Sequence, residues 1–177
     1  DMEAHDWDRP VAWELLRPDG TKQQWTREVR GETDPTKFVV DEILRRRNRN
    51  TTFVAHNGGG YDFQPLVFEL IDRDDARLKT VLNDSTGDIF YVEIEDEHGK
   101  PRRLQDSMKI MPRGLADLAS DMADVDKLEP ELFDVAEIPP VLSDMDDDAR
   151  GELLDYLHYD CKALRECLES FTQIIDD

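Results

Sequence analysis

The chain has 177 residues, 42 of them acidic and 22 basic, which gives a formal net charge of −20. This length suits one domain of ordinary size with a hydrophobic core of its own. No apolar run approaches the roughly 20 residues of a transmembrane helix, so we expect no membrane span and no membrane partner. The polar start at Asp1 predicts no secretory signal, and because this residue is not Met we expect the chain to be part of a longer, cytoplasmic protein.

The acidic surplus has two explanations. A chain of this charge repels nucleic acid at low salt, so its ligand could be something other than nucleic acid. The other explanation is a high-salt cytoplasm, because the screening length falls to about 3 Å at 1 M salt and long-range repulsion vanishes. A composition rich in Asp and poor in Lys resembles that of halophile proteins. We favour the second explanation, a halophilic protein.

The first part of the chain predicts a β-hairpin followed by a helix. Residues 11–16 and 22–26 are predicted strands, and a Pro-Asp-Gly turn joins them. Asp34 followed by Pro35 is typical of a helix N-terminus. The apolar face of this helix is expected to contain Phe38, Val39, Ile43 and Leu44. The arginines at 45–49 favour a solvated helix end, with phosphate contact as the alternative.

A glycine-rich segment separates the next predicted strand from the next helix. The strand covers residues 51–55, glycines occupy 58–60, and Asp62 precedes a helix at 64–71. Glycines allow a positive φ or the close approach of a ligand backbone. Open α/β sheets often place their chemistry at such strand ends. We therefore expect a functional site here, and the alternative is a plain glycine-rich turn with a solvated Asp62.

The rest of the chain predicts strands, helices and one long acidic connection. The strands are expected at 78–82, 89–94 and 103–111, the helices at 114–122 and 148–175, and the connection at 124–148. The apolar face of the last helix should contain Leu153, Leu157, Leu164, Leu168, Phe171 and Ile175. Tyr156 and Asp160 are four residues apart, so they share a helix face beside these residues. The alternative is an ordinary surface tyrosine and a solvated aspartate.

Four carboxylates stand out when the motifs are combined. Asp1 and Glu3 form an Asp-x-Glu pair that points one way if it lies in a strand, whereas the alternative is a frayed terminus. Together with Asp62 and Asp160 they would repel one another strongly unless cations held them. Oxygen ligands of this kind suit Mg²⁺ or Mn²⁺. Two such cations can activate a water and stabilise the leaving oxygen of a phosphodiester.

The order and spacing of these motifs resemble the 3′→5′ proofreading exonuclease domain of family B DNA polymerases, the DEDD group with tyrosine. The text His-Asn-Gly-Gly-Gly-Tyr-Asp-Phe at 56–63 is most similar to the protein-primed branch. The resemblance implies a ribonuclease H-like α/β fold, a mixed sheet of about five strands flanked by helices. It also implies one exonuclease domain over 1–177, within a longer polymerase. The implied reaction is hydrolysis of the terminal phosphodiester of single-stranded DNA.

The resemblance implies a role for each motif residue. Asp1, Glu3, Asp62 and Asp160 match the ligands of two divalent cations, Mg²⁺ or Mn²⁺. Tyr156 matches the tyrosine that orients the attacking water or the scissile phosphate. These five residues are the implied catalytic set.

Further residues match positions that bind nucleic acid. Asn57 and Tyr61 match residues that hold the single-stranded 3′ end, and Phe63 would join Tyr61 in stacking on bases. Ser107, within Asp-Ser-Met at 106–108, resembles a Ser/Thr-Leu segment that contacts single-stranded DNA and the terminal protein. The expected partners are therefore a DNA 3′ end, a terminal protein and the polymerase domain of the same chain.

The chain departs from the family pattern at several positions. Ala4 stands where Thr is usual, and Met108 stands where Leu is usual. Lys127 is a candidate for a lysine that assists the site, although its neighbours fit poorly. Asp6 or Asp8 could replace Asp1 as a ligand. Two other functions stay open, a stand-alone DEDD-type ribonuclease and a catalytically dead module that binds nucleic acid or terminal protein.

Overall fold

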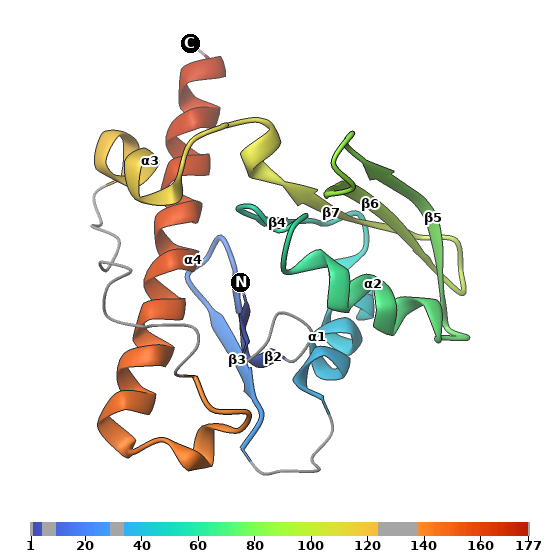
Figure 1. The fold of residues 1–177 in the computed structure, drawn as a ribbon. Coiled ribbons are helices and arrows are strands. Elements are labelled where there is room, and N and C mark those ends of the chain that lie inside the picture. Colours follow the sequence, from blue (N-terminus) through green and yellow to red (C-terminus); the bar gives the residue numbers. More distant parts are fainter. Residues whose placement is uncertain (1, 5–9, 29–33, 124–137, 177) are drawn as a thin grey trace. The chain divides into compact units, whose positions relative to one another are not determined.

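A computed structural model describes residues 2–4, 10–28, 34–123 and 138–176 (Figure 1). The chain divides into two compact units, which we describe one at a time. The terminal unit comprises residues 1–33 and 113–177, and the central unit comprises residues 34–112. Both contain helices and strands, so the predicted α/β class is confirmed. Within the described ranges, no helix is long and apolar enough to cross a membrane.

The described part of the terminal unit contains a three-stranded antiparallel sheet and two helices. Its sheet has the order β1-β2-β3, with β1 at Met2–Ala4, β2 at Pro10–Leu16 and β3 at Lys22–Thr26. The helices are α3, Leu115–Met122, and α4, Asp147–Asp176, and a short 3₁₀ turn, η5, covers Leu142–Asp144. The helix α3 packs against α4, which also packs against β2 (Figure 1). The predicted hairpin and final helix are therefore confirmed.

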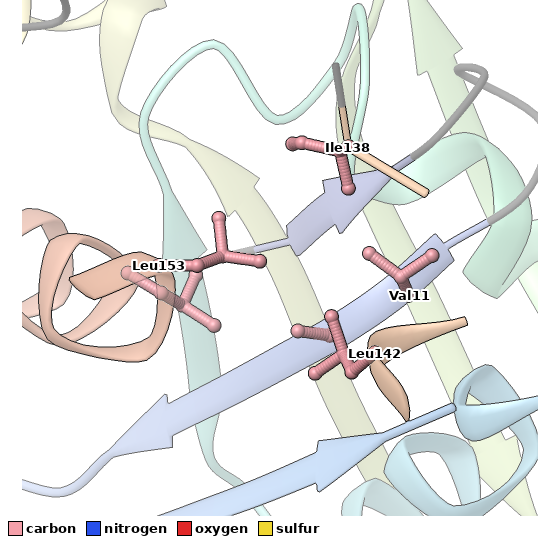
Figure 2. Packing of buried hydrophobic residues seen from close by; sticks show 6 residues of the cluster. Val11, Ile138, Leu142 and Leu153 are labelled. Carbon is pink, nitrogen blue, oxygen red and sulfur yellow. The ribbon is translucent and has the colours of Figure 1, made fainter. Parts of the chain in front are cut away.

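The core of the terminal unit gathers around β2. Figure 2 shows Val11 of β2, Ile138, Leu142 and Leu153 of α4, which belong to one cluster of buried hydrophobic side chains. The backbone fastens this region too, because Leu142 N–H donates to the carbonyl of Arg27 at 2.8 Å. The apolar face predicted for α4 is confirmed at Leu153, Leu157 and Leu164, which are buried. Ile175, at the far end of the same face, is exposed.

The central unit contains a four-stranded mixed sheet in the order β4-β7-β6-β5. The pair β4 and β7 is parallel, whereas β7 and β6, and β6 and β5, are antiparallel. The strands are β4 Thr52–Ala55, β5 Ala76–Asn83, β6 Ile89–Asp96 and β7 Pro101–Asp106. The helices are α1 Pro35–Leu44 and α2 Phe63–Ile71, with 3₁₀ turns η1 Arg46–Asn48 and η2 Ser107–Lys109. Across the ranges that the structure describes, there are seven strands in two sheets, and not the expected single sheet of about five strands.

Local sequence signals place the helix α1 correctly. The carboxylate of Asp34 accepts the Thr36 N–H at 2.9 Å, and Pro35 occupies the first turn, as the N-terminal signal predicts. Val39 and Ile43 are buried as expected. Phe38 is exposed, which corrects its place in the predicted apolar face.

The arginines after α1 bind acidic side chains. Arg45 and Arg47 both contact the carboxylate of Glu42, at 3.1 and 2.6 Å. Arg49 contacts Asp96 at 2.9 Å. Glu42 is buried, and although burial by itself raises its pKa, the hydrogen bonds from Arg47 and Asn48 outweigh that effect and lower it. The cluster therefore neutralises acids of its own unit.

The guanidinium of Arg102, on β7, is fully buried and uses all five of its N–H donors. Nε donates to the carbonyl of Ile43 at 3.1 Å, and one terminal nitrogen donates to the carbonyls of Leu44 at 2.8 Å and Arg45 at 3.2 Å. The other terminal nitrogen contacts the carbonyl of Lys100 at 2.7 Å and the carboxylate of Asp96 at 3.0 Å. Since the last carbonyls of a helix lack partners within it, Arg102 completes the end of α1 and fixes it to β7.

Replacing Arg102 should destabilise the central unit strongly. In Arg102→Met the helix-end carbonyls and Asp96 lose their donor inside the protein, and removal of one partner from a buried ion pair costs about 3–5 kcal/mol. Arg103→Met is the matched control, because that side chain is 40% exposed and should cost less than about 1 kcal/mol. Urea denaturation of both variants measures the difference. Equal free energies of unfolding for the two variants would contradict the role of Arg102.

The stabilisation from Asp96 should depend on pH. Burial alone would raise the pKa of Asp96, but hydrogen bonds from the Lys100 N–H, Arg102 and Arg49 outweigh it and hold the pKa well below its ordinary value. Because the folded-state pKa is lowered, this stabilisation is complete above the unfolded-state pKa of about 3.9 and is lost as pH falls below it.

The free energy of unfolding that Asp96→Asn removes should be constant from about pH 7 to pH 5 and should shrink below about pH 4. Urea denaturation of the wild type and the variant at each pH gives this difference. Asp74→Asn, at an exposed position of the same unit, should show a small difference at every pH. A difference for Asp96→Asn that stays constant down to pH 3 would contradict the pKa shift.

Candidate functional site

Polar residues gather at one edge of the sheet in the central unit. Because β4 and β7 are parallel, with Ala55 beside Asp106, both strands end at the same edge. His56 and Asn57 follow β4 there, and Ser107 follows β7. The segment 56–62, which we call the motif loop, begins at this edge and leads into α2. The tertiary structure thus joins two motifs that lie about fifty positions apart in the sequence.

The carboxylate of Asp106 is fully buried and binds the backbone of the motif loop. Its Oδ1 accepts N–H donors from Asn57 at 3.0 Å and from Met108 at 2.9 Å. Its Oδ2 accepts the N–H of Gly59 at 3.2 Å. Hydrogen bonds to a charged acceptor are about twice as strong as neutral ones, so these contacts fix the start of the loop.

A second link at the same edge comes from Ser107. Its hydroxyl donates to the carbonyl of Ala55 at 3.2 Å and lies 3.0 Å from Nδ1 of His56. Ser107 is fully buried. The hydroxyl therefore connects the ends of β4 and β7, and its contact with single-stranded DNA stays a prediction.

Two of the three glycines of the motif loop, Gly58 and Gly59, are explained by packing within the protein. None of the three has a positive φ, which occurs instead at Asn57, with φ of 60°. A Cβ at Gly59 would overlap the carbonyl oxygen of Ile89, and one at Gly58 would lie 2.6 Å from the Cβ of Ala55. Gly58 and Gly59 therefore allow the loop to pack closely against β4 and β6.

The motif residues at the end of the loop differ in exposure. Asp62 is only 4% exposed, and its side chain does not cap α2. Tyr61 is 54% exposed, whereas Phe63 is 2% exposed. An added Cβ at Gly58 would lie 3.0 Å from the Phe63 ring, so this ring packs beneath the loop. The structure leaves Tyr61 accessible for stacking and corrects the expectation that Phe63 stacks on a base.

The other motif residues belong to the terminal unit. Asp160 on α4 is 7% exposed, and Tyr156, one turn earlier, is partly buried. Glu3 lies in β1, where its backbone pairs opposite Ala12 of β2. Since α4 also packs against β2, the strand that carries Glu3 and the helix that carries the third motif both contact β2. Asp1, Asp6, Asp8 and Lys127 lie outside the described residues.

Sequence analysis missed a buried acid between these motifs. Glu14 of β2 is buried, and its carboxylate accepts a hydrogen bond from Gln24 at 2.8 Å and lies 2.7 Å from Nδ1 of His158. His158 stands on α4 between Tyr156 and Asp160, so the contact holds that turn of the helix to β2. The sequence signal was a glutamate within the apolar run of the strand at 10–16.

Asp62 and Asp160, two of the predicted ligands, are buried, whereas most acidic side chains in the described ranges are not. Within the described ranges, five acidic side chains are buried: Glu14, Glu42, Asp62, Asp106 and Asp160. Among the described side chains, no group of three His, Cys, Asp or Glu residues could hold a metal ion. The predicted ligand set also contains Asp1 and the side chain of Glu3, which the description does not cover.

Comparison of the chain with protein-family models, with curated proteins and with solved structures found no match. A functional proposal for this chain therefore depends on its own residues.

The contrast between Gly59 and its neighbour gives a test of the motif loop. Gly59→Ala should destabilise the central unit by about 1–3 kcal/mol or more, because the new methyl group would overlap the Ile89 carbonyl of β6. Gly60→Ala should be tolerated within about 0.5 kcal/mol, since the nearest atom to its Cβ is 3.6 Å away. Urea denaturation compares the two variants. A larger loss in Gly60→Ala than in Gly59→Ala would contradict this packing.

Proposed function

We propose that this chain is a metal-dependent 3′→5′ exonuclease that hydrolyses the terminal phosphodiester of single-stranded DNA. It would serve as the proofreading part of a DNA polymerase, with the ribonuclease H-like fold of the protein-primed family B type. The observation that carries the proposal is the burial of Asp62 and Asp160, at 4% and 7% exposure. The motif resemblance implies that these same two residues are ligands.

Burial is informative because most aspartate and glutamate side chains lie at the protein surface. Within the described ranges, only five acidic side chains are buried. Two of these five are the predicted ligands. A coincidence of this kind is expected if the second and third motifs form a functional site, and it is unusual for solvated surface acids.

The donor set fits divalent cations. Asp1, Glu3, Asp62 and Asp160 would supply carboxylate oxygens, which suit Mg²⁺ and Mn²⁺. When bound, two such cations supply an activated water and stabilise the leaving oxygen. In the overall reaction, the oxygen of water bonds to the terminal phosphorus and the bond to the 3′ oxygen breaks. The products are a nucleoside 5′-monophosphate and a shortened strand with a 3′ hydroxyl.

The other motif residues would bind and orient the substrate. The Tyr156 hydroxyl would orient the attacking water or the scissile phosphate. The exposed ring of Tyr61 would stack on a base, which suits a low sequence preference because every base has a flat face. The Asn57 side chain would hold the 3′ end. A terminal protein and the polymerase domain of a longer chain would be the partners.

The charge of the chain sets the conditions for activity. At a net charge of −20, long-range repulsion should weaken DNA binding at low salt. At molar KCl the screening length is about 3 Å and that repulsion disappears. We therefore propose a high-salt cytoplasm as the working environment.

The decisive experiment is digestion of 3′-labelled single-stranded DNA and RNA with Mg²⁺ or Mn²⁺, at low and molar KCl. The wild type should trim DNA from its 3′ end, with activity kept or raised at high salt. Asp62→Ala and Asp160→Ala should each lower the rate by at least about a hundredfold. Loss of a residue that only hydrogen-bonds to a metal ligand typically costs about ten- to a hundredfold. Asp155→Ala, an exposed acid on α4, is the matched control and should keep full activity.

A further variant separates the two roles of Asn57. Asn57→Gly keeps the positive φ and removes the side chain, so the fold should persist while KM for DNA rises. Preference for RNA would instead favour a stand-alone ribonuclease. No metal-dependent trimming at any salt concentration would overturn the proposal and favour a binding module. Loss of activity on transfer to molar KCl would contradict the high-salt environment.

A further inference from the structure

We propose that Asp106 is a positioning residue, whose buried carboxylate sets the conformation of the motif loop and thereby the places of Tyr61 and Asp62. The effect on catalysis rests on the proposed function, whereas the effect on the loop stands by itself. The sequence places Asp106 beside Ser107 and predicts no role for its own side chain. The structure gives it a separate task.

The hydrogen bonds of the loop begin at Asp106. Its two carboxylate oxygens accept the N–H groups of Asn57 and Gly59, at 3.0 and 3.2 Å. It also accepts the N–H of Met108 at 2.9 Å, so the same carboxylate fixes the turn after its own strand. Both oxygens are therefore engaged by backbone donors, which suits a structural acid better than a cation ligand.

Backbone contacts carry this restraint from Asn57 to the end of the loop. The Asn57 carbonyl accepts the N–H of Gly60 at 3.2 Å. The Gly58 carbonyl accepts the N–H of Tyr61 at 3.2 Å and that of Phe63 at 2.8 Å. Asp62 lies between these last two residues. Its backbone is thus placed by a short series of turns that starts at the Asp106 carboxylate.

The loop needs such a restraint because its conformation is costly. Asn57 has a φ of 60°, a conformation that non-glycine residues rarely adopt. The three glycines that follow have much conformational freedom in the unfolded chain. Gly59 is pressed against β6, where the N–H of Ile89 donates to its carbonyl at 3.3 Å. A fixed negative acceptor opposite two N–H groups of this segment selects one conformation.

The test compares Asp106→Asn with Asp84→Asn. Asparagine keeps the shape of Asp106 but places an NH₂ donor against one backbone donor of the loop. Asp84 is a matched control in the same unit, because its carboxylate also accepts backbone N–H groups in a turn, from Thr86 at 2.8 Å and Asp88 at 3.1 Å. The measurements are amide hydrogen exchange by NMR and the kcat and KM for single-stranded DNA.

Asp106→Asn should accelerate amide exchange at Asn57 or Gly59 by at least about tenfold, the scale of one lost charged hydrogen bond. It should lower kcat by about ten- to a hundredfold, as expected when a reactive group is displaced by about 1 Å, with KM changed less than about threefold. Asp84→Asn should change neither the exchange at those amides nor kcat. Asp106→Glu, which keeps the charge but not the geometry, should resemble Asp106→Asn.

Each result decides one part of the proposal. Rapid exchange of the Asn57 and Gly59 amides in the wild type would overturn the restraint without any variant, even if Asp106→Asn fails to fold. Accelerated exchange with unchanged kcat would overturn the positioning role. A wild type without nuclease activity would defeat the proposed function and the catalytic consequence, whereas the exchange data would still decide whether Asp106 holds the loop.

Discussion

The buried guanidinium of Arg102 is the interaction on which the central unit depends. It binds the last carbonyls of α1, the carbonyl of Lys100 and the carboxylate of Asp96 at the same time. A buried charge is stable only when its hydrogen bonds are complete, and here every donor has an acceptor. The end of α1 and the turn between β6 and β7 must therefore form together with the start of β7. The sheet edge with the motif loop is built on this frame.

The strand β7 is fixed by charged groups at both of its ends. Arg102 stands near its start and donates to its surroundings, and Asp106 stands at its end and accepts from them. The parallel partner β4 lies between these two anchors, so its last residue is held beside Asp106. The motif loop then leaves β4 at a defined place and angle. This arrangement explains how a segment with three consecutive glycines can have one conformation.

The acidic residues of the chain set its net charge as a group, whereas the buried ones also make specific contacts. The 42 acids outnumber the 22 basic residues and give the chain its net charge of −20. The buried ones have individual tasks: Glu42 binds Arg45 and Arg47, Glu14 lies against Gln24 and His158, and Asp106 binds backbone N–H groups. Asp62 and Asp160 are also buried in the described part, and they are two of the residues that we propose as cation ligands. Total charge alone therefore says little about where the chemistry lies.

The sequence alone determined the elements whose signals are local. The hairpin at β2 and β3, the capped start of α1 at Asp34, and the long helix α4 follow from turn residues, an N-cap and helical spacing. The spacing of Tyr156 and Asp160 put them on one helix face in the same way. These features depend on residues a few positions apart, which the sequence displays directly.

The tertiary structure decided every feature that joins distant segments. The bonds from Asp106 to Asn57 and Gly59 span 49 and 47 positions, and the contact between Glu14 and His158 spans 144. No local pattern marks Arg102 as buried, because its acceptors lie on α1 and in a turn. Likewise, Gly59 and Phe63 have their roles only because β6 and β4 lie against the loop. Packing between strands far apart in the chain fixed these roles, and periodicity within one element carries no information about it.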